Sequence, residues 1–243
     1  MSRSTRATRR DDDRLTPDGP ISNDDKAVRV RAMFDRIAGR YDLLNRVLTF
    51  GMDVGWRRRA VRELRLPPAS VVFDLACGTG DLCRELAGAG YRPVGFDFAS
   101  GMLSAARVAD PLVQADVLAL PVADGAADGV TCGFALRNVS DLERLFAEMT
   151  RVLRPGGRVA ILEVATPSRA ILRMGHAAYF RGMVPLIGGL LSDRAAYRYL
   201  PRSMAYLPPP ETLEGMMRAA GFSDIARIPL AGGIAQILKG TRG

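Results

Sequence analysis

The stretch VVFDLACGTGD, residues 71–81, joins an apolar run to a turn that contains two glycines, and this junction decides the fold. Asp74 stands near the end of the run, and the amphipathic segment DLCRELAGA follows Gly80. This order predicts a strand, a turn and a helix. Gly78 and Gly80 permit positive φ angles and a close approach of the backbone, so the turn predicts a place where main-chain amides meet a ligand.

Apolar and amphipathic runs alternate from this turn to residue 163, which predicts βαβ units and a parallel sheet. Ala231, Gly232 and Gly233 separate two further apolar runs, which favours an antiparallel hairpin over another crossover. We therefore expect an α/β fold with helices on both faces of a sheet of seven strands, mostly parallel, with an antiparallel last strand. The predicted strands cover residues 71–75, 93–97, 112–115, 129–134, 158–163, 224–230 and 234–239, and the predicted helices among the first five cover 81–89, 100–108 and 141–151.

The composition fits one globular domain with a full-sized core, because 48% of the 243 residues are hydrophobic and 25% are charged. No run approaches the roughly 18 to 20 apolar residues that cross a bilayer, and the first residues lack the apolar stretch of a secretory signal. We expect a cytoplasmic protein. Cys77, Cys83 and Cys132 are odd in number and lie in apolar segments without paired histidines, which predicts packed, reduced thiols and no metal site.

A net charge of +8 favours anionic partners. The densest basic segment is WRRRAVRELRL, residues 56–66, which reads as one helix with Trp56 on its apolar side. We expect its arginines to form a solvated face, with contact to a membrane surface as the alternative. These arginines are Arg57, Arg58, Arg59, Arg62 and Arg65.

The turn at residues 78–80 is compatible with two classes of nucleotide cofactor. A dinucleotide fingerprint G-x-G-x-x-G/A needs glycine or alanine three residues after Gly80, where Cys83 stands, and Asp74 would repel a pyrophosphate. S-adenosylmethionine carries no phosphate, and its ammonium group is a donor for Asp74, directly or through water. The turn therefore favours S-adenosylmethionine.

Acidic residues also follow the next two predicted strands. Asp97 ends PVGFDF, where a carboxylate can accept hydrogen bonds from both ribose hydroxyls, each worth about 1.5 to 3 kcal/mol. Asp116 in LVQADVLALP can accept from the adenine amino group while Val117 covers the ring. One such aspartate often caps a turn, but three in series lie where open α/β sheets bind ligands. The residues expected to bind the cofactor are Asp74, Gly78, Thr79, Gly80, Asp97, Phe98, Met102, Asp116, Val117, Gly133 and Phe134.

Longer motifs frame this core. YDLLNRVLTFGMDVGW, residues 41–56, and RVLRPGGRVAILEVATP, residues 151–167, are similar to the two signatures of the ubiquinone/menaquinone biosynthesis C-methyltransferase family, and FDLACGTGD, DFASGML and ALRNVSD lie between them. The resemblance covers roughly residues 28–240. It implies a Rossmann-like class I methyltransferase fold, S-adenosylmethionine as the cofactor and C-methylation of a demethylated quinol ring, in this case demethylmenaquinol.

The resemblance also implies residues at the reacting end of the site, where the quinol ring would meet the methyl group of the cofactor. Arg137 and Asn138 follow the predicted fourth strand, where the family carries the same pair. Arg137 is no free base at neutral pH, so we expect it to stabilise a developing phenolate and to orient water, while Asn138 holds a quinol oxygen. The alternative is that the pair only ties its loop to the sheet. The residues expected at the substrate or in a lid are Phe34, Tyr41, Asp42, Asn45 and His176.

Four positions depart from the family pattern, and the C-terminal end AGGIAQILKGTRG, residues 231–243, also lacks the usual histidine of the final strand. Thr49 and Asp53 stand where the first signature usually has serine and histidine, and His176 stands where tyrosine is common. Gly133 replaces a serine, so this position can meet the cofactor only through its backbone. The departures at Thr49, Asp53 and His176 bear on the identity of the quinol more than on methyl transfer.

Boundary signals divide the chain. Ser140 and Glu143 form a capping box that predicts a helix start, and RPGGR, residues 154–158, predicts the end of that helix before the next strand. We expect a flexible leader over residues 1–24 and a single methyltransferase domain over residues 25–243. Its parts are a helical preface and lid over 25–66, a cofactor-binding core over 71–165, a helical substrate-side insertion over 166–207, and a C-terminal helix and hairpin over 208–243.

Two other functions fit parts of the sequence. C- or O-methylation of another small aromatic, such as a polyketide, keeps the fold and the cofactor, and a non-catalytic subunit of the same fold would scaffold a quinone-synthesis assembly. ALRNV lacks the D/N-P-P-Y/F turn and the Pro-Cys pair of nucleic-acid methyltransferases, so we expect no nucleic acid partner. The expected partners are a lipophilic quinol, the inner face of the cell membrane as a peripheral contact, and a second copy of the chain in a homodimer.

Overall fold

The stretch at residues 71–81 forms a strand, a turn and a helix, as predicted. A computed structural model describes residues 23–167 and 206–243, and in it β1 covers Val71–Leu75 and α4 covers Asp81–Gly88. Gly78 and Gly80 have φ angles of 57° and 82°, a backbone conformation that side chains with a Cβ rarely adopt. The turn between strand and helix therefore depends on its glycines.

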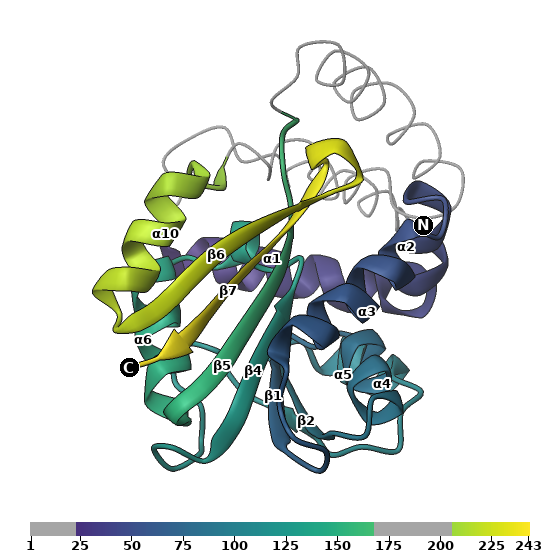
Figure 1. Ribbon diagram of the computed structural model, residues 1–243. Helices are drawn as coiled ribbons and strands as arrows, with labels where there is room; N and C mark the ends of the chain where they lie inside the picture. Colours follow the sequence, from purple (N-terminus) through teal and green to yellow (C-terminus); the bar gives the residue numbers. More distant parts are fainter. Residues whose placement is uncertain (1–22, 168–205) are drawn as a thin grey trace, which may run out of the picture.

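One seven-stranded sheet runs through the described residues in the order β3-β2-β1-β4-β5-β7-β6 (Figure 1). The strands β1 to β5 are parallel, and β7 is antiparallel to both of its neighbours, β5 and β6. The predicted fold class and the C-terminal hairpin are confirmed. The remaining strands are β2 (Arg92–Asp97), β3 (Leu112–Gln114), β4 (Ala127–Gly133), β5 (Leu153–Val164), β6 (Phe222–Leu230) and β7 (Ala235–Arg242).

Helices cover both faces of the sheet because alternate residues of each strand are apolar on either side. Val72 packs with Leu64 of α3 and Leu86 of α4 on one face. Phe73, its neighbour in β1, packs with residues of α6 and α10. Figure 1 shows these two helices on the opposite side of the sheet from α3 and α4. The helices are α1 (Asn23–Ile37), η2 (Ala38–Arg40), α2 (Tyr41–Leu48), α3 (Met52–Leu64), α5 (Ser100–Ala105), η3 (Leu136–Asn138), α6 (Leu142–Val152), α10 (Pro210–Ala219) and η6 (Ala231–Gly233).

The helical preface lies against the carboxyl ends of β1 and β2. Phe34 of α1 and Tyr41 of α2 pack with Ala99 and with Met102 of α5. The order of strands reverses between β1 and β4, and in open α/β sheets ligands bind at this point. The preface therefore covers the carboxyl ends of the strands, where this type of fold binds its ligand.

Three boundary predictions were wrong, and the first is the helix predicted over residues 100–108, which ends at Ala105. Asp141, and not Ser140, caps α6, because the Asp141 carboxylate accepts a hydrogen bond of 2.9 Å from the amide of Arg144. The segment RPGGR does not separate α6 from the next strand, since β5 already begins at Leu153. A register shift in the pairing of β5 with β4, together with a φ of 75° at Gly156, accommodates these residues within the strand.

Other predictions fall partly outside the described residues. Most of the leader and of the substrate-side insertion lies in residues 1–22 and 168–205, and these parts of the domain division stay predictions. Cys77, Cys83 and Cys132 are buried and unbridged, as expected. None of the helices in the described parts of the chain is long and apolar enough to cross a membrane.

Candidate functional site

A cavity of about 500 Å³ opens at the carboxyl ends of β1 to β4, beneath the preface. Its walls come from α1, α2, α3, the turn after β1, and the segments that follow β2, β3 and β4. The volume is that of an ordinary small-molecule site. The predicted residues that line it are Phe34, Tyr41, Asp74, Gly78, Thr79, Asp97, Phe98, Met102, Asp116, Val117, Gly133, Phe134 and Asn138.

Asp74 is the most deeply buried acid of the cavity wall, with 1% of its surface exposed. Its Oδ1 accepts a hydrogen bond of 2.8 Å from the hydroxyl of Thr131, which lies opposite it on β4, and its Oδ2 faces the Cys83 sulfur at 3.6 Å. Burial raises the pKa of Asp74 to about 7, although the bonds from Thr131 and Cys83 lower it. A cationic ligand would therefore draw a proton off this carboxyl at neutral pH.

Asp97 at the end of β2 holds the glycine turn in place. One carboxylate oxygen accepts from the amide of Gly78 at 2.8 Å, and the other accepts from the amide of Ala99 at 2.9 Å. Burial raises the pKa of Asp97, and these amide bonds lower it. The Phe98 amide also donates to this carboxylate, and because a carboxylate has about four acceptor positions, it keeps acceptor capacity for a ligand hydroxyl. Asp97 thus fixes the turn and faces the cavity at once.

Asp116 follows β3 at the more open end of the cavity. It is exposed, and its Oδ1 accepts from the amide of Leu118 at 2.9 Å. Val117 and Leu118 line the wall beside it, and Phe98 lines the wall from the β2 side. This end therefore combines one acceptor with apolar surfaces that suit a flat ring.

Four predicted residues do not line the cavity. A Cβ at Gly80 would lie 2.9 Å from Val108, so a glycine is needed here to leave room for Val108 and to allow the conformation of the turn. Asp42 accepts a hydrogen bond from the hydroxyl of Thr79 and so ties the preface to the turn. Asn45 is the hydrogen-bond partner of Tyr41, the residue four positions before it. The fourth is Arg137, and His176 lies outside the described residues.

Arg137 is buried against Glu163 of β5 and is 6% exposed. Glu163 is fully buried, and the oxygen that pairs with Arg137 also accepts from the amide of Val164 at 2.9 Å. Burial raises the pKa of Tyr41 in the cavity wall, whereas the Asn45 bond and the charges of Arg137 and Arg57 lower it. The charge of Arg137 therefore acts on the cavity wall, while Asn138, its neighbour in η3, lines the cavity itself.

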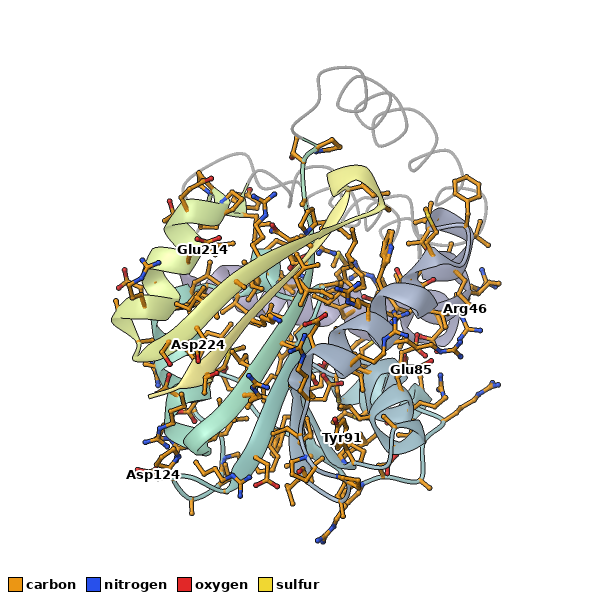
Figure 2. All side chains as sticks on the ribbon, viewed as in Figure 1. Arg46, Glu85, Tyr91, Asp124, Glu214 and Asp224 are labelled. Atoms are coloured by element: carbon orange, nitrogen blue, oxygen red, sulfur yellow. The ribbon has the colours of Figure 1, made fainter. Side chains whose placement is uncertain are left out.

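The sequence prediction missed Arg57. The arginines of α3 were expected to form a solvated face, and Arg58 does lie at the surface beside Glu85 of α4, which Figure 2 labels. Arg57 is instead 6% exposed, lines the cavity and pairs with Asp53 one helical turn earlier. The spacing of four residues between Asp53 and Arg57 was the available signal.

Arg57 joins a charged network between the preface and the glycine turn. Its Nη2 lies 3.3 Å from Oδ2 of Asp81, the first residue of α4. Asp53 accepts a further bond of 2.7 Å from the hydroxyl of Thr49, so two of the positions that depart from the family pattern lie in one network. Burial raises the pKa of Asp53, but the bonds from Thr49 and Arg57 outweigh burial and hold it below its ordinary value.

Phe134 continues this wall on the β4 side. Its φ of 58° is a strained value for a residue with a large side chain. The ring lies under the Arg57 guanidinium at 5.8 Å and beside Trp56 at 6.5 Å, and Trp56 packs on the sheet. These contacts are worth about 1 kcal/mol or more where solvent is excluded, and they hold Arg57 against the cavity.

Comparison with known proteins bears on this site. The model of the ubiE/COQ5 methyltransferase family matches residues 22–242. The chain belongs to this family. The resemblance inferred from the two signature stretches is thereby confirmed, and with it the enzyme class.

Similar proteins cover nearly the same length. The chain is 46% identical over 221 residues to a Thermus thermophilus protein named demethylmenaquinone methyltransferase, with 86% of this chain and 100% of that protein covered. It is 40% identical over 230 residues to a Geobacter protein named ubiquinone/menaquinone biosynthesis C-methyltransferase UbiE, with 90% of this chain and 98% of that protein covered.

A crystal structure from Thermotoga maritima supports the fold. It is described as a SAM-dependent methyltransferase, possible histamine N-methyltransferase, and superposes with a TM-score of 0.64 over 87% of this chain and 99% of that one. The two sequences are 18% identical, so the likeness concerns the fold alone.

Proposed function

We propose that this protein methylates a ring carbon of demethylmenaquinol with S-adenosylmethionine as the methyl donor, a step of quinone biosynthesis. The observation that carries the choice of substrate is the 46% identity to a full-length relative named demethylmenaquinone methyltransferase. The cavity at the strand ends supports the chemistry, since it brings a polar cofactor wall and an apolar roof together.

The residues of the cavity fit S-adenosylmethionine. The backbone at Gly78 can approach a ligand closely, Asp97 keeps acceptor capacity for ribose hydroxyls, and Asp116 beside Val117 suits an adenine ring. Asp74 offers a carboxylate to the cationic part of the molecule. When bound, S-adenosylmethionine supplies an electrophilic methyl group on a good leaving group, so the protein mainly has to align the acceptor and exclude water.

The reacting end lies where η3 meets the preface. Asn138 can hold a quinol oxygen from the cavity wall, and the charge of Arg137 behind it favours the ionised form of that oxygen. Tyr41 keeps its proton at neutral pH, since its ordinary pKa of 10.0 is already high and burial raises it further, so it acts there as a hydrogen-bond donor. Phe34 stands edge-on to the Tyr41 ring, with centroids 5.8 Å apart, and closes the roof over an apolar ring.

The experiment is a transfer assay with methyl-labelled S-adenosylmethionine and demethylmenaquinol under reducing conditions. Label on the quinol ring carbon is expected, and its absence rejects the proposal. A benzoquinol and a polyketide phenol, assayed side by side, test the substrate choice. Faster labelling of either acceptor would replace demethylmenaquinol with that acceptor.

Arg137→Ala tests the reacting end. We expect turnover to fall by about 100-fold or more while the affinity for S-adenosylhomocysteine changes less than threefold, because the removed charge acts on the transition state. The ratio of the two effects is the readout. An equal loss of both would return Arg137 to a structural role.

We further propose that the protein works at the cytoplasmic face of the membrane, where a prenylated quinol resides. Leu43 and Val47 are exposed on one face of α2, and Met52 is exposed at the start of α3. Arg46 and Arg58 are exposed on the same two helices and suit anionic headgroups. Flotation with anionic vesicles should carry the wild type upward and the Leu43→Ser, Val47→Ser double variant less. The homodimer stays a prediction.

A further inference from the structure

The Arg57–Asp81 ion pair lies in the cavity wall, and the cofactor assignment above leaves it unused. We propose that it binds the zwitterionic methionyl end of the cofactor, with Arg57 taking the α-carboxylate and Asp81 Oδ2 sharing the α-ammonium with Asp74. The inference rests on the cofactor of the proposed function and names two further binding residues for it.

The order of the strands gives the direction of the ligand. With adenine beside Asp116 after β3 and ribose at Asp97 after β2, the methionyl end lies toward the turn after β1 and the start of α4. Asp81 is the first residue of α4, and Arg57 reaches the same wall from α3. Both line the cavity. The pair therefore stands at the end where the cofactor carries its charged groups.

The hydrogen-bonding state of the pair points to a ligand. Asp81 is 8% exposed, and its Oδ2 receives no hydrogen bond in the described structure, although Arg57 Nη2 lies 3.3 Å away. A buried carboxylate oxygen without a donor is costly, and an ammonium group would supply one. The other oxygen of Asp81 already accepts from Arg84 at 2.6 Å. Oδ2 is thus the one oxygen of Asp81 that has no hydrogen-bond donor in the described structure.

Arg57 has donors left for a carboxylate. A guanidinium carries five N–H groups in a planar fork, and in the described structure the side chain donates one hydrogen bond, to Asp53. Phe134 beneath the guanidinium and Asp53 beside it fix its position. A guanidinium fixed in this way loses little freedom when it binds a carboxylate.

Charge balance favours a zwitterion over a simple anion. Arg57 already lies between Asp53 and Asp81, so a ligand that brought only a carboxylate would add a third negative group beside Arg57, while Arg84 at 2.6 Å and Arg46 at 4.0 Å pair with the other oxygen of Asp81. A ligand that brings an ammonium with its carboxylate forms an alternating set with the pair. Asp74, in the same wall, adds to the attraction for the cation.

The test compares three ligands by calorimetry. S-adenosylhomocysteine carries both charged groups, its decarboxylated analogue carries only the ammonium, and 5′-methylthioadenosine carries neither. Arg57→Ala should weaken S-adenosylhomocysteine by about 10- to 100-fold and leave the other two within threefold, because only the carboxylate contact is lost. Asp81→Asn should weaken the two ligands that carry an ammonium and spare methylthioadenosine.

Two control variants separate this role from others. Arg58→Ala, on the neighbouring exposed position of α3, should change none of the three affinities. Arg31 also lines the cavity, so Arg31→Ala tests the competing carboxylate partner. If Arg31→Ala, and not Arg57→Ala, weakens S-adenosylhomocysteine selectively, the proposal is overturned. An equal loss of all three ligands in Arg57→Ala would likewise assign Arg57 to the shape of the cavity.

The wild type alone provides a further measurement that needs no variant to fold. It should bind S-adenosylhomocysteine at least about 100-fold more tightly than methylthioadenosine, and a ratio below about threefold contradicts a zwitterion site. Binding of none of the three ligands would count against the cofactor of the proposed function. If the protein methylates the quinol normally but binds S-adenosylhomocysteine and methylthioadenosine with similar affinity, only this inference is overturned and the proposed function stands.

Discussion

The turn after β1 and the segment after β4 both end at the cavity, yet they are built in different ways. The turn is made of local backbone: Gly78 and Gly80 take positive φ angles, and Asp97 of the next strand accepts from the Gly78 amide. The segment after β4 carries a strained Phe134 and an Arg137 whose partner comes from β5. The turn is thus fixed mainly by the conformation of its own backbone, and the segment after β4 mainly by a buried pair of charges.

The largest expected change in stability comes from breaking the Arg137–Glu163 ion pair after β4. Glu163→Ala leaves a buried guanidinium without its partner and should lower the free energy of unfolding by about 3 to 5 kcal/mol. Chemical denaturation measures it. Arg154→Ala, which breaks a pair with Asp128 at the surface, is the control and should cost less than about 1 kcal/mol.

The same pair allows a sharper version of this test. The double variant Arg137→Met, Glu163→Leu removes both charges and should recover most of the stability that Glu163→Ala loses. Activity should not recover, because the charge behind Asn138 is gone. A stable and fully active double variant would show that the pair serves the fold alone.

A smaller effect is expected at the glycine turn. Gly80→Ala puts a Cβ 2.9 Å from Val108 at a φ of 82°, and should cost about 1 to 3 kcal/mol of folding free energy. Cofactor affinity should fall with it, because the turn shifts. Gly39→Ala is the matched control, since a Cβ there has nothing within 4 Å. Equal stabilities of the two variants would contradict the account of the turn.

The last effect is on cofactor affinity and concerns protonation of Asp74. Its pKa is about 7, above the ordinary 3.8, so the folded chain without ligand keeps a proton there up to neutral pH. The stability from this group is complete below pH 4 and is lost as the pH rises from about 4 to 7. A cationic ligand prefers the ionised carboxyl, so its affinity should rise with pH and level off above about 7.

Calorimetry in buffers of different ionisation enthalpy measures the accompanying proton release. Near pH 6.5 the wild type should release a fraction of one proton for each S-adenosylmethionine bound, and Asp74→Asn should release none from this site. Thr131→Val removes the hydroxyl that stabilises the carboxylate, so it should move the levelling point to higher pH. Identical profiles for Thr131→Val and the wild type would contradict the assignment.

Much of the cofactor end could be predicted from the sequence because its signals are local. The apolar run, the glycine spacing and the acids at strand ends each lie within a few residues, and the cavity brings Asp74, Asp97 and Asp116 together. Helix and strand ends were less predictable. Ser140 and Asp141 are both good caps, and only the folded geometry selects Asp141.

Burial of charge could not be predicted in this way. Arg57 lies in a run of three arginines, and a run of that kind indicates solvent exposure. It is buried because Asp53 and Asp81 reach it from two different helices, and Asp81 is 24 positions away along the chain. Arg137 was expected to face the substrate, but Glu163 draws its side chain away from the cavity. The Arg57–Asp81 and Arg137–Glu163 pairings exist only once the sheet has formed, whereas the Asp53–Arg57 spacing lies within one helix.

The most direct test of the account is a crystal structure of the protein with S-adenosylhomocysteine. Adenine should lie beside Asp116 and Val117, the ribose hydroxyls on Asp97, and the amino acid end at the turn after β1. A purified protein that binds a nicotinamide or flavin cofactor in this cavity, or that places S-adenosylhomocysteine elsewhere, would contradict it.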